Sequence, residues 1–308
     1  MVKRSVSPLI LLFLLFAVMA VAQRPTSTPQ EESIIKIRAD LITVLVSVTD
    51  QRGQLINSLG KDDFELIENS TTQEIVTFGR ENSLPLQLVL LFDVSSSVKP
   101  RLKFEQQAAT KFFKDILRPI DRAALLSFSH DVMVEQDFTS NVEALVNATR
   151  SLKAKGGTAL YDAIYLAAQR LEKGPGRHVI VIISDGANTI SKTTLESALR
   201  MTERADAAIY GIYTATRLLD ERDPYVIHGD QELQQICERT GGEVFFPNNI
   251  NDLNDIFAQL AAVLRAQYAL SYYSKNDQRD GTYRTLKINV KDANLKVRTR
   301  KGYYAPKD

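Results

Sequence analysis

Polar side chains at three places in the sequence could together hold a divalent cation. Asp93, Ser95 and Ser97 alternate directly after the apolar run 86–92, Thr158 follows two glycines, and Asp185 follows a second apolar run. Carboxylate and hydroxyl oxygens are the hard ligands that Mg2+, Mn2+ and Ca2+ prefer. We expect Mg2+, with Mn2+ or Ca2+ as alternatives, although so few carboxylates argue against tight Ca2+ binding.

The strands and helices around these residues must bring them to one edge of a sheet. The runs 86–92 and 178–184 are nearly all apolar, which is typical of strands buried on both faces of a parallel sheet. From residue 84, predicted strands alternate with helices, as in βαβ units. Ligands of such sheets bind beyond the carboxyl ends of the strands, so we expect the three loops to converge across a topological switch point.

The predicted α/β region is a doubly wound, mostly parallel sheet over residues 84–265. We expect its strands over 86–93, 121–129, 178–185, 208–213 and 243–246, with a short antiparallel edge strand over 131–137. We expect its helices over 99–117, 142–152, 159–172, 193–205, 231–240 and 251–265. In the first helix, Leu102 and Phe104 are expected on the buried face.

Both flanks of this region are rich in predicted strands. Period-two alternation covers 35–49, 62–68 and 74–78 before it, and 268–273, 283–290 and 295–300 after it. We expect 34–83 to form an N-terminal β-rich module, and 266–308 to supply strands that complete the same module. Arg300 and Lys301 are expected on a solvated edge.

The first residues have the pattern of a signal peptide. Lys3 and Arg4 precede an apolar run over 9–21, which ends in small residues around Ala22, so we assign 1–23 to the signal peptide and 24–33 to a flexible leader. The run is short for a membrane span. The cleavage point has no nearby cysteine, which excludes a lipoprotein. We expect a secreted, periplasmic or cell-envelope protein, with an uncleaved membrane anchor as the alternative.

Composition excludes several function classes. The formal net charge is +1 and the basic residues are dispersed, so nucleic-acid binding has no electrostatic support. The single cysteine, Cys237, cannot form an internal disulfide, and no Cys/His cluster indicates zinc or iron–sulfur binding. The sequence leaves the oligomeric state open.

The three polar motifs resemble the metal-ion-dependent adhesion site (MIDAS) of von Willebrand factor type A (VWFA) domains. They are Asp93-Val-Ser-Ser-Ser97, Thr158 after two glycines, and Ser184-Asp185-Gly186, and the resemblance covers about residues 84–264. It implies a Rossmann-like fold and Mg2+-dependent protein binding, with Ser95, Ser97 and Thr158 on the metal and Asp93 and Asp185 acting directly or through water. The whole chain also resembles the exported VWFA-related proteins of acidobacteria, through its leader, its 50–53 and 62–65 segments and its terminal segment 300–306.

The leading hypothesis is therefore an exported, metal-dependent protein-binding module for adhesion or interaction, without catalytic residues. Its cation would accept an Asp or Glu carboxylate from a protein partner. One alternative is a structural envelope protein with a vestigial site, since each motif alone could be an ordinary turn or helix cap. A second alternative is a Mg2+-dependent hydrolase. It is less favoured, because the sequence has no nucleophile elbow, no phosphate loop and no His or Lys base near Ser95.

Overall fold

The computed structural model describes residues 40–80, 84–185, 188–214 and 224–307. The chain divides into two compact units, 1–38 and 39–308, and every described residue belongs to the second. The predicted signal peptide, the leader and residues 34–39 therefore lie outside the described residues. Within the described ranges, every helix is too short or too polar to cross a membrane.

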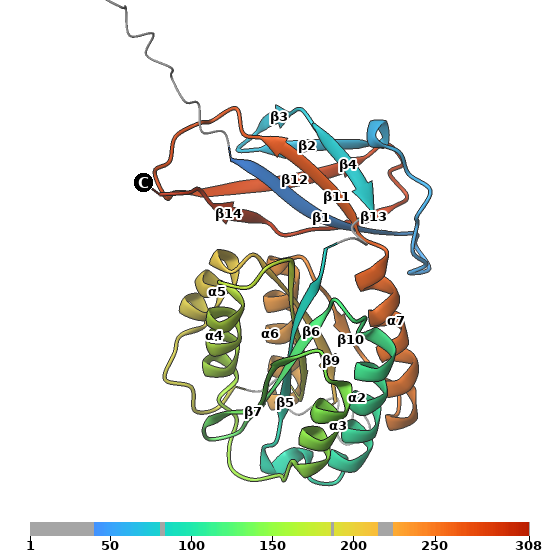
Figure 1. The fold of residues 1–308 in the computed structure, drawn as a ribbon, viewed down its shortest axis with the longest axis vertical. Helices are drawn as coiled ribbons and strands as arrows, with labels where there is room; N and C mark the ends of the chain where they lie inside the picture. Colours follow the sequence, from blue (N-terminus) through green and yellow to red (C-terminus); the bar gives the residue numbers. More distant parts are fainter. Residues whose placement is uncertain (1–39, 81–83, 186–187, 215–223, 308) are drawn as a thin grey trace, which may run out of the picture. The chain divides into compact units, whose positions relative to one another are not determined.

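A six-stranded sheet forms the centre of the α/β region, in the order β10-β9-β8-β5-β6-β7 (Figure 1). All neighbouring strands are parallel except β6 and β7, which are antiparallel. The strands are β5 (Leu86–Asp93), β6 (Arg122–Phe128), β7 (Val132–Thr139), β8 (Arg177–Ser184), β9 (Ala207–Tyr213) and β10 (Val244–Phe245). All eight residues of β5 are buried, as its continuous apolar run predicts.

Helices cover both faces of this sheet (Figure 1). On one face lie α2 (Leu102–Ile116), α3 (Val142–Ser151) and α7 (Leu253–Arg265), which share a core with Leu88, Leu90 and Phe92 of β5. On the other lie α4 (Leu160–Leu171), α5 (Leu195–Arg204) and α6 (Pro224–Thr240), which pack with Val89 and Leu91. The side chains of β5 thus alternate between two cores, and the predicted doubly wound sheet is confirmed.

Two four-stranded antiparallel sheets, in the orders β13-β1-β11-β4 and β14-β12-β2-β3, form a β-sandwich. N-terminal strands are β1 (Leu41–Thr49), β2 (Phe64–Glu68), β3 (Thr71–Gln73) and β4 (Thr77–Arg80); C-terminal ones are β11 (Tyr268–Tyr273), β12 (Tyr283–Val290), β13 (Lys296–Arg298) and β14 (Gly302–Tyr304). Val44, Leu66, Leu270 and Ile288 are among the residues of their shared core. Each sheet therefore combines strands from both flanks, while the exact domain boundaries stay a prediction.

The start of α2 differs from the predicted helix over 99–117. A short 3-10 turn, η2 (Ser96–Val98), comes first, and the helix begins at Leu102. The placement of Phe104 on the buried face is wrong, because its side chain is 49% exposed. The buried register instead runs through Glu105, Ala108, Ala109, Phe112, Phe113 and Ile116, and Phe104 lies a quarter-turn outside it.

Two predicted strands are wrong in their extent for one shared reason. Residues 74–76 are not strand, because there the chain crosses from β3 in one sheet to β4 in the other. Residues 299–301 make the same kind of crossing, from β13 to a strand that was not predicted, β14. The expected solvated edge is also wrong for Arg300, whose side chain is only 15% exposed and pairs with Asp206.

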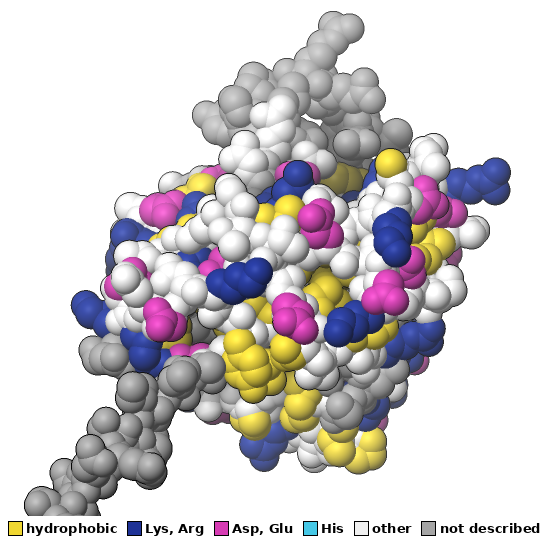
Figure 2. Space-filling view, turned by 90° about the horizontal axis from the view of Figure 1, so that it is seen from above, with side chains coloured by type: hydrophobic (Ala, Val, Ile, Leu, Met, Phe, Trp, Pro, Cys, Tyr) yellow, Lys and Arg dark blue, Asp and Glu magenta, His cyan; other side chains and the backbone are white. Residues whose placement is uncertain are grey.

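Charged side chains of both signs are mixed on the molecular surface. In Figure 2, Lys and Arg side chains alternate with Asp and Glu over the visible face, with apolar side chains between them. Exposed ion pairs such as Lys111–Asp115 have the same mixed character. This pattern agrees with a net charge of +1.

Candidate metal site

Asp93 ends β5 and holds two neighbouring strands together through its buried carboxylate. Its Oδ1 accepts a hydrogen bond from the Ser95 backbone N–H at 2.8 Å. Its Oδ2 accepts one from Ser184 Oγ, at the end of β8, at 2.6 Å. Because the residue is fully buried, these bonds fix the path of the loop after β5 and orient the side chains that follow.

Three oxygen atoms from two loops meet at the surface beside Asp93. Ser97 Oγ donates to Asp185 Oδ2 at 2.6 Å, and Ser95 Oγ lies 3.0 Å from Ser97 Oγ. Since the single hydroxyl proton of Ser97 goes to Asp185, Ser95 is the donor of the second bond. Ser95 is buried, whereas Ser97 is exposed and Asp185 partly exposed. The cluster can therefore be reached from solvent on one side.

Thr158 is placed beside this cluster by its backbone and its loop. Lys155 N donates to Val94 O at 2.6 Å, and Ser96 N donates to Gly156 O at 3.0 Å, so the loop before α4 runs against the Asp93 loop. Gly156 has φ +79°, a left-handed conformation that favours glycine. Thr158 itself is buried and exchanges hydrogen bonds with Thr189 through its backbone. Direct bonds thus join Asp93, Ser95, Ser97 and Asp185, and Thr158 lies in the adjoining loop.

Sequence reasoning missed an ion-pair bridge beneath the cluster. Arg101, at the start of α2, contacts Asp185 Oδ2 through Nη2 at 3.1 Å and Glu105 Oε1 through Nε at 3.1 Å. Glu105 is fully buried, and its Oε2 has no hydrogen-bond partner among the described residues. A signal was present in the sequence, because Glu105 occupies the same i, i+3, i+4 register as Ala108, Ala109 and Phe112. A charged residue at a position of that apolar register indicates that its side chain is buried against the core.

The carboxylates around the cluster lie in surroundings that disfavour negative charge. The pKa of Asp93 is raised to about 6, mainly by burial and then by the nearby charge of Asp185, against hydrogen bonds from Ser184 and Ser95. Burial likewise raises the pKa of Glu105 to about 7, although Arg101 opposes the shift. Arg101 pairs with only two of the three carboxylates, Asp185 and Glu105, and the site has negative charge that a bound cation would neutralise.

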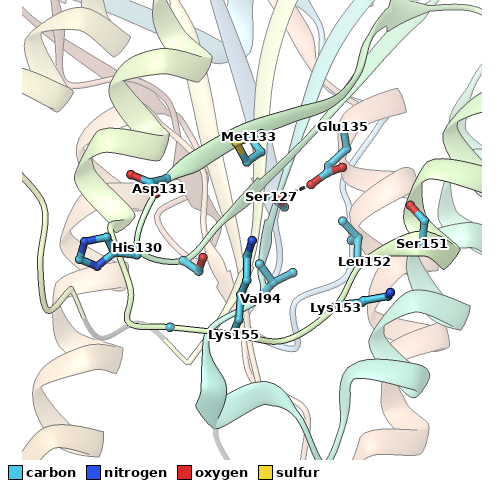
Figure 3. A pocket seen from close by; sticks show the side chains of 12 residues that line it. Val94, Ser127, His130, Asp131, Met133, Glu135, Ser151, Leu152, Lys153 and Lys155 are labelled. Carbon is cyan, nitrogen blue, oxygen red and sulfur yellow. Dashed lines mark hydrogen bonds between the residues drawn. The ribbon is translucent and has the colours of Figure 1, made fainter.

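A pocket of about 680 Å³ opens next to the cluster (Figure 3). Ser127 of β6, Met133 and Glu135 of β7, and Lys153 and Lys155 of the loop after α3 lie on its walls. Ser127 Oγ donates to Glu135 Oε1 at 2.6 Å, the dashed line in Figure 3. The lining also includes Val94, in the loop after β5, and Gly156, in the adjoining loop that holds Thr158. A molecule bound at the cluster would therefore have a mixed-charge pocket directly beside it.

The donor chemistry suits a hard divalent cation with few protein carboxylates. Hydroxyl and carboxylate oxygens converge without a histidine or thiolate, the choice that Mg2+ favours over softer metals. Among the described residues, no three His, Cys, Asp or Glu side chains come together as a metal-binding group. Any cation here would thus rely on hydroxyls and water for the rest of its coordination, with Ser95, Ser97, Thr158, Asp93 and Asp185 as the residues to hold it.

Comparison with known proteins agrees with this arrangement of loops and strands. Residues 88–188 match the family described as von Willebrand factor type A domain. This chain contains a VWFA domain. The matched residues include most of β5, all of β6, β7 and β8, and all five residues of the candidate site.

Curated relatives of the VWFA-containing chain are distant in sequence. A UPF0353 protein of Mycolicibacterium vanbaalenii is 26% identical over 56% of this chain and 58% of its own length. An uncharacterized protein of Synechocystis sp. is 31% identical over 35% of this chain and 27% of its own. The chain thus spans between about a quarter and three fifths of the length of these relatives.

Solved structures agree on the fold of the VWFA region. Proximal thread matrix protein 1 from the mussel byssus is similar with a TM-score of 0.50. The similarity covers 64% of this chain and 51% of that protein at 14% identity. At such identity the likeness concerns the α/β fold alone.

Proposed function

We propose that this chain is an exported protein-binding module whose VWFA domain binds a partner through a divalent cation at the MIDAS-like cluster. The observation that carries the proposal is the solvent-accessible group of Ser95 Oγ, Ser97 Oγ and Asp185 Oδ2. Mg2+ is the expected ion, with Mn2+ and Ca2+ as alternatives. When bound, such a cation supplies a Lewis-acid position that can accept a carboxylate from outside.

The partner we propose is a protein that offers an Asp or Glu side chain. A cation held mainly by neutral hydroxyls keeps much of its positive charge, which favours an anionic group from the partner. The pocket lined by Lys153, Lys155 and Glu135 lies beside the cluster and could accommodate the residues next to that carboxylate. The surrounding loops would then set specificity.

We assign the hydroxyl groups a binding role rather than a catalytic one. Within the described residues, Ser97 donates to a carboxylate and Ser95 to Ser97, and neither is paired with a histidine or lysine that could activate it. The proposal of export rests on the signal-peptide pattern over 1–23.

Calorimetric titration of residues 24–308 with Mg2+, Mn2+ and Ca2+ tests the metal. We expect saturable binding in the wild type, and a loss of at least about tenfold in affinity in Asp93→Ala and in Ser97→Ala. Asp255→Ala removes an exposed carboxylate of α7 and should bind as the wild type does. Ser97 is exposed, so its variant should keep the fold, as circular dichroism can verify.

A peptide array tests the partner chemistry. Arrays of otherwise identical peptides with Glu or Gln at one position are probed with the Mn2+-loaded chain and again in EDTA. Selective, EDTA-sensitive capture of Glu peptides supports the proposal. Capture that persists in EDTA would instead indicate the structural role with a vestigial site, and hydrolysis of a phosphoester that is lost in Asp93→Ala would indicate an enzyme.

A further inference from the structure

We propose that Arg101 is a built-in counter-cation of the candidate site, which must release Asp185 before a divalent cation can bind there. This inference rests on the proposed metal-binding function and adds a competition between a side chain and the ion. Arg101 would then be a positioning residue that sets the affinity of the site.

Arg101 occupies the carboxylate oxygen that a cation would need. Its Nη2 lies 3.1 Å from Asp185 Oδ2, the same oxygen that accepts the hydrogen bond from Ser97 Oγ. Its Nη1 also lies 3.4 Å from the backbone oxygen of Ser97. The side chains of Arg101 and Asp185 are only 14% and 15% exposed, so water screens this pair less than an ordinary surface pair. Two of the five predicted metal ligands are therefore in contact with a protein cation.

Glu105 offers Arg101 a second position one helical turn along α2. Nε of Arg101 already lies 3.1 Å from Glu105 Oε1. The other oxygen, Oε2, is buried and has no partner among the described residues, which is costly for a charged acceptor. Arginine and carboxylate commonly form two parallel hydrogen bonds. A short rotation of the guanidinium from Asp185 towards Oε2 would complete such a pair and satisfy the orphan oxygen.

Arg101 has opposite effects on the metal-free and the metal-bound states of the site. Without metal, Arg101 neutralises part of the negative charge of Asp185 and Glu105 and stabilises the fold. With metal, the same positive charge must be moved aside, which lowers the apparent affinity for the ion. Replacing Arg101 should therefore tighten metal binding and destabilise the metal-free protein.

Four variants of residues 24–308 test this by Mg2+ and Mn2+ calorimetry and by thermal unfolding in EDTA and in saturating Mg2+. We expect Arg101→Gln to bind metal about tenfold more tightly than wild type, with a lower melting temperature in EDTA and a smaller deficit in Mg2+. Lys99→Gln is the matched control, because Lys99 is exposed, lies in the same loop and has no ion pair among the described residues. It should change affinity by less than about threefold.

The position offered by Glu105 is tested separately. Glu105→Gln should weaken metal binding, since Arg101 then keeps its contact with Asp185. The double variant Arg101→Gln/Glu105→Gln should bind as tightly as Arg101→Gln alone, because Glu105 acts through Arg101. Glu105→Gln also keeps the size of the buried side chain, so it provides a readout if Arg101→Gln folds poorly.

The outcomes separate this inference from the proposed function. If the wild type binds metal and Arg101→Gln binds it equally or more weakly, the counter-cation role is wrong and the metal site stands. If Lys99→Gln tightens binding as much as Arg101→Gln does, the effect is one of general charge and the inference is again wrong. If neither the wild type nor Arg101→Gln binds Mg2+ or Mn2+, both proposals are wrong.

Discussion

At the scale of single residues, Asp121 shows how one buried carboxylate can fix the start of a central strand. Its Oδ1 accepts from the Leu86 backbone N–H at 2.8 Å, and both its oxygens accept from Arg118. Burial alone would raise the pKa of Asp121, but the hydrogen bonds from Arg118 and Leu86 outweigh it and hold the pKa below its usual value. The ionised form is therefore the one that the folded protein stabilises.

Asp121→Asn should lower the free energy of unfolding by about 2–3 kcal/mol at pH 7, because one acceptor oxygen becomes a donor that faces other donors. A depressed pKa stabilises the fold above the unfolded value of about 3.9 and ceases to do so as pH falls through the folded pKa. The difference between variant and wild type should therefore shrink steadily below about pH 4, as urea unfolding at a series of pH values can measure. Asp115→Asn, in an exposed pair with Lys111, should change stability by less than about 0.5 kcal/mol at any pH; an equal effect in both would contradict the assignment.

The candidate site could be predicted only in part from the types and spacing of its residues. The alternation of Asp93, Ser95 and Ser97 after an apolar run, and Asp185 after another, predicts oxygens that the structure does bring together. Arg101 was not predicted, because an arginine before a helix is ordinary and its partner Asp185 is far away in sequence. Whether the five residues bind a metal stays a prediction.

At the scale of elements, Gly241 directly follows α6 and allows the C-terminal segment to lie against the end of that helix. Gly241 has φ +89°, and a Cβ there would collide with the backbone of Thr299 and Arg300. Lys301 N donates to Arg239 O at 3.2 Å across the same contact. This end of the helix therefore needs glycine for two reasons: the left-handed conformation and the close backbone.

Gly241→Ala should destabilise the protein by more than about 3 kcal/mol, since the strain of a positive φ adds to a clash with rigid backbone. Gly53→Ala separates the two contributions, because Gly53 has φ +80° with open space around its Cβ position. It should cost only about 1–2 kcal/mol. Denaturant unfolding of both variants measures the difference, and equal losses would show that the contact with Arg300 contributes nothing.

Most helices and strands of the α/β region could be predicted, because each has a long periodic or continuous apolar pattern. In the β-sandwich, by contrast, the prediction fails where the chain changes sheets, at 74–76 and 299–301. Ile75 is buried and Arg300 is largely covered there without belonging to a strand, so the local pattern resembles a strand while tertiary contacts bend the chain. No local signal distinguishes such a crossing from a continuing strand.

At the scale of the whole molecule, the two β-sheets of the sandwich join segments that lie far apart in sequence. Leu41 pairs with Tyr273, and Val290 pairs with Phe64. The sequence predicted strands on both flanks, but their partners depend on the α/β region between them. Pairing therefore became visible only with the structure.

Ile288→Ala should loosen the sandwich and leave the six-stranded sheet unchanged. Ile288 is buried in β12 opposite Leu66, in the core shared by both sandwich sheets. A cavity there should cost about 2–4 kcal/mol. Hydrogen exchange should therefore accelerate in β1, β2 and β11 but not in β5 or β8. Ile180→Ala, in the core of α4, α5 and α6, should give the opposite pattern; acceleration throughout the chain in both variants would mean that the described unit opens only as a whole.

The position of Arg177 has a consequence for the order in which the chain folds. Arg177 begins β8 opposite Leu86 of β5, and its Nη1 donates to Leu264 O at 2.7 Å and to Gln267 Oε1 at 3.3 Å. The two ends of the α/β region therefore meet at one residue as soon as that region is folded: the start of β5 at the backbone of Arg177, and the end of α7 at its guanidinium. The two halves of the sandwich are then held at a high effective concentration, and the entropy of closing the long loop between them has already been lost. The α/β region should accordingly fold before the sandwich and bring its two halves together. Although β1 is synthesised early, it would then pair with β11 and β13 last.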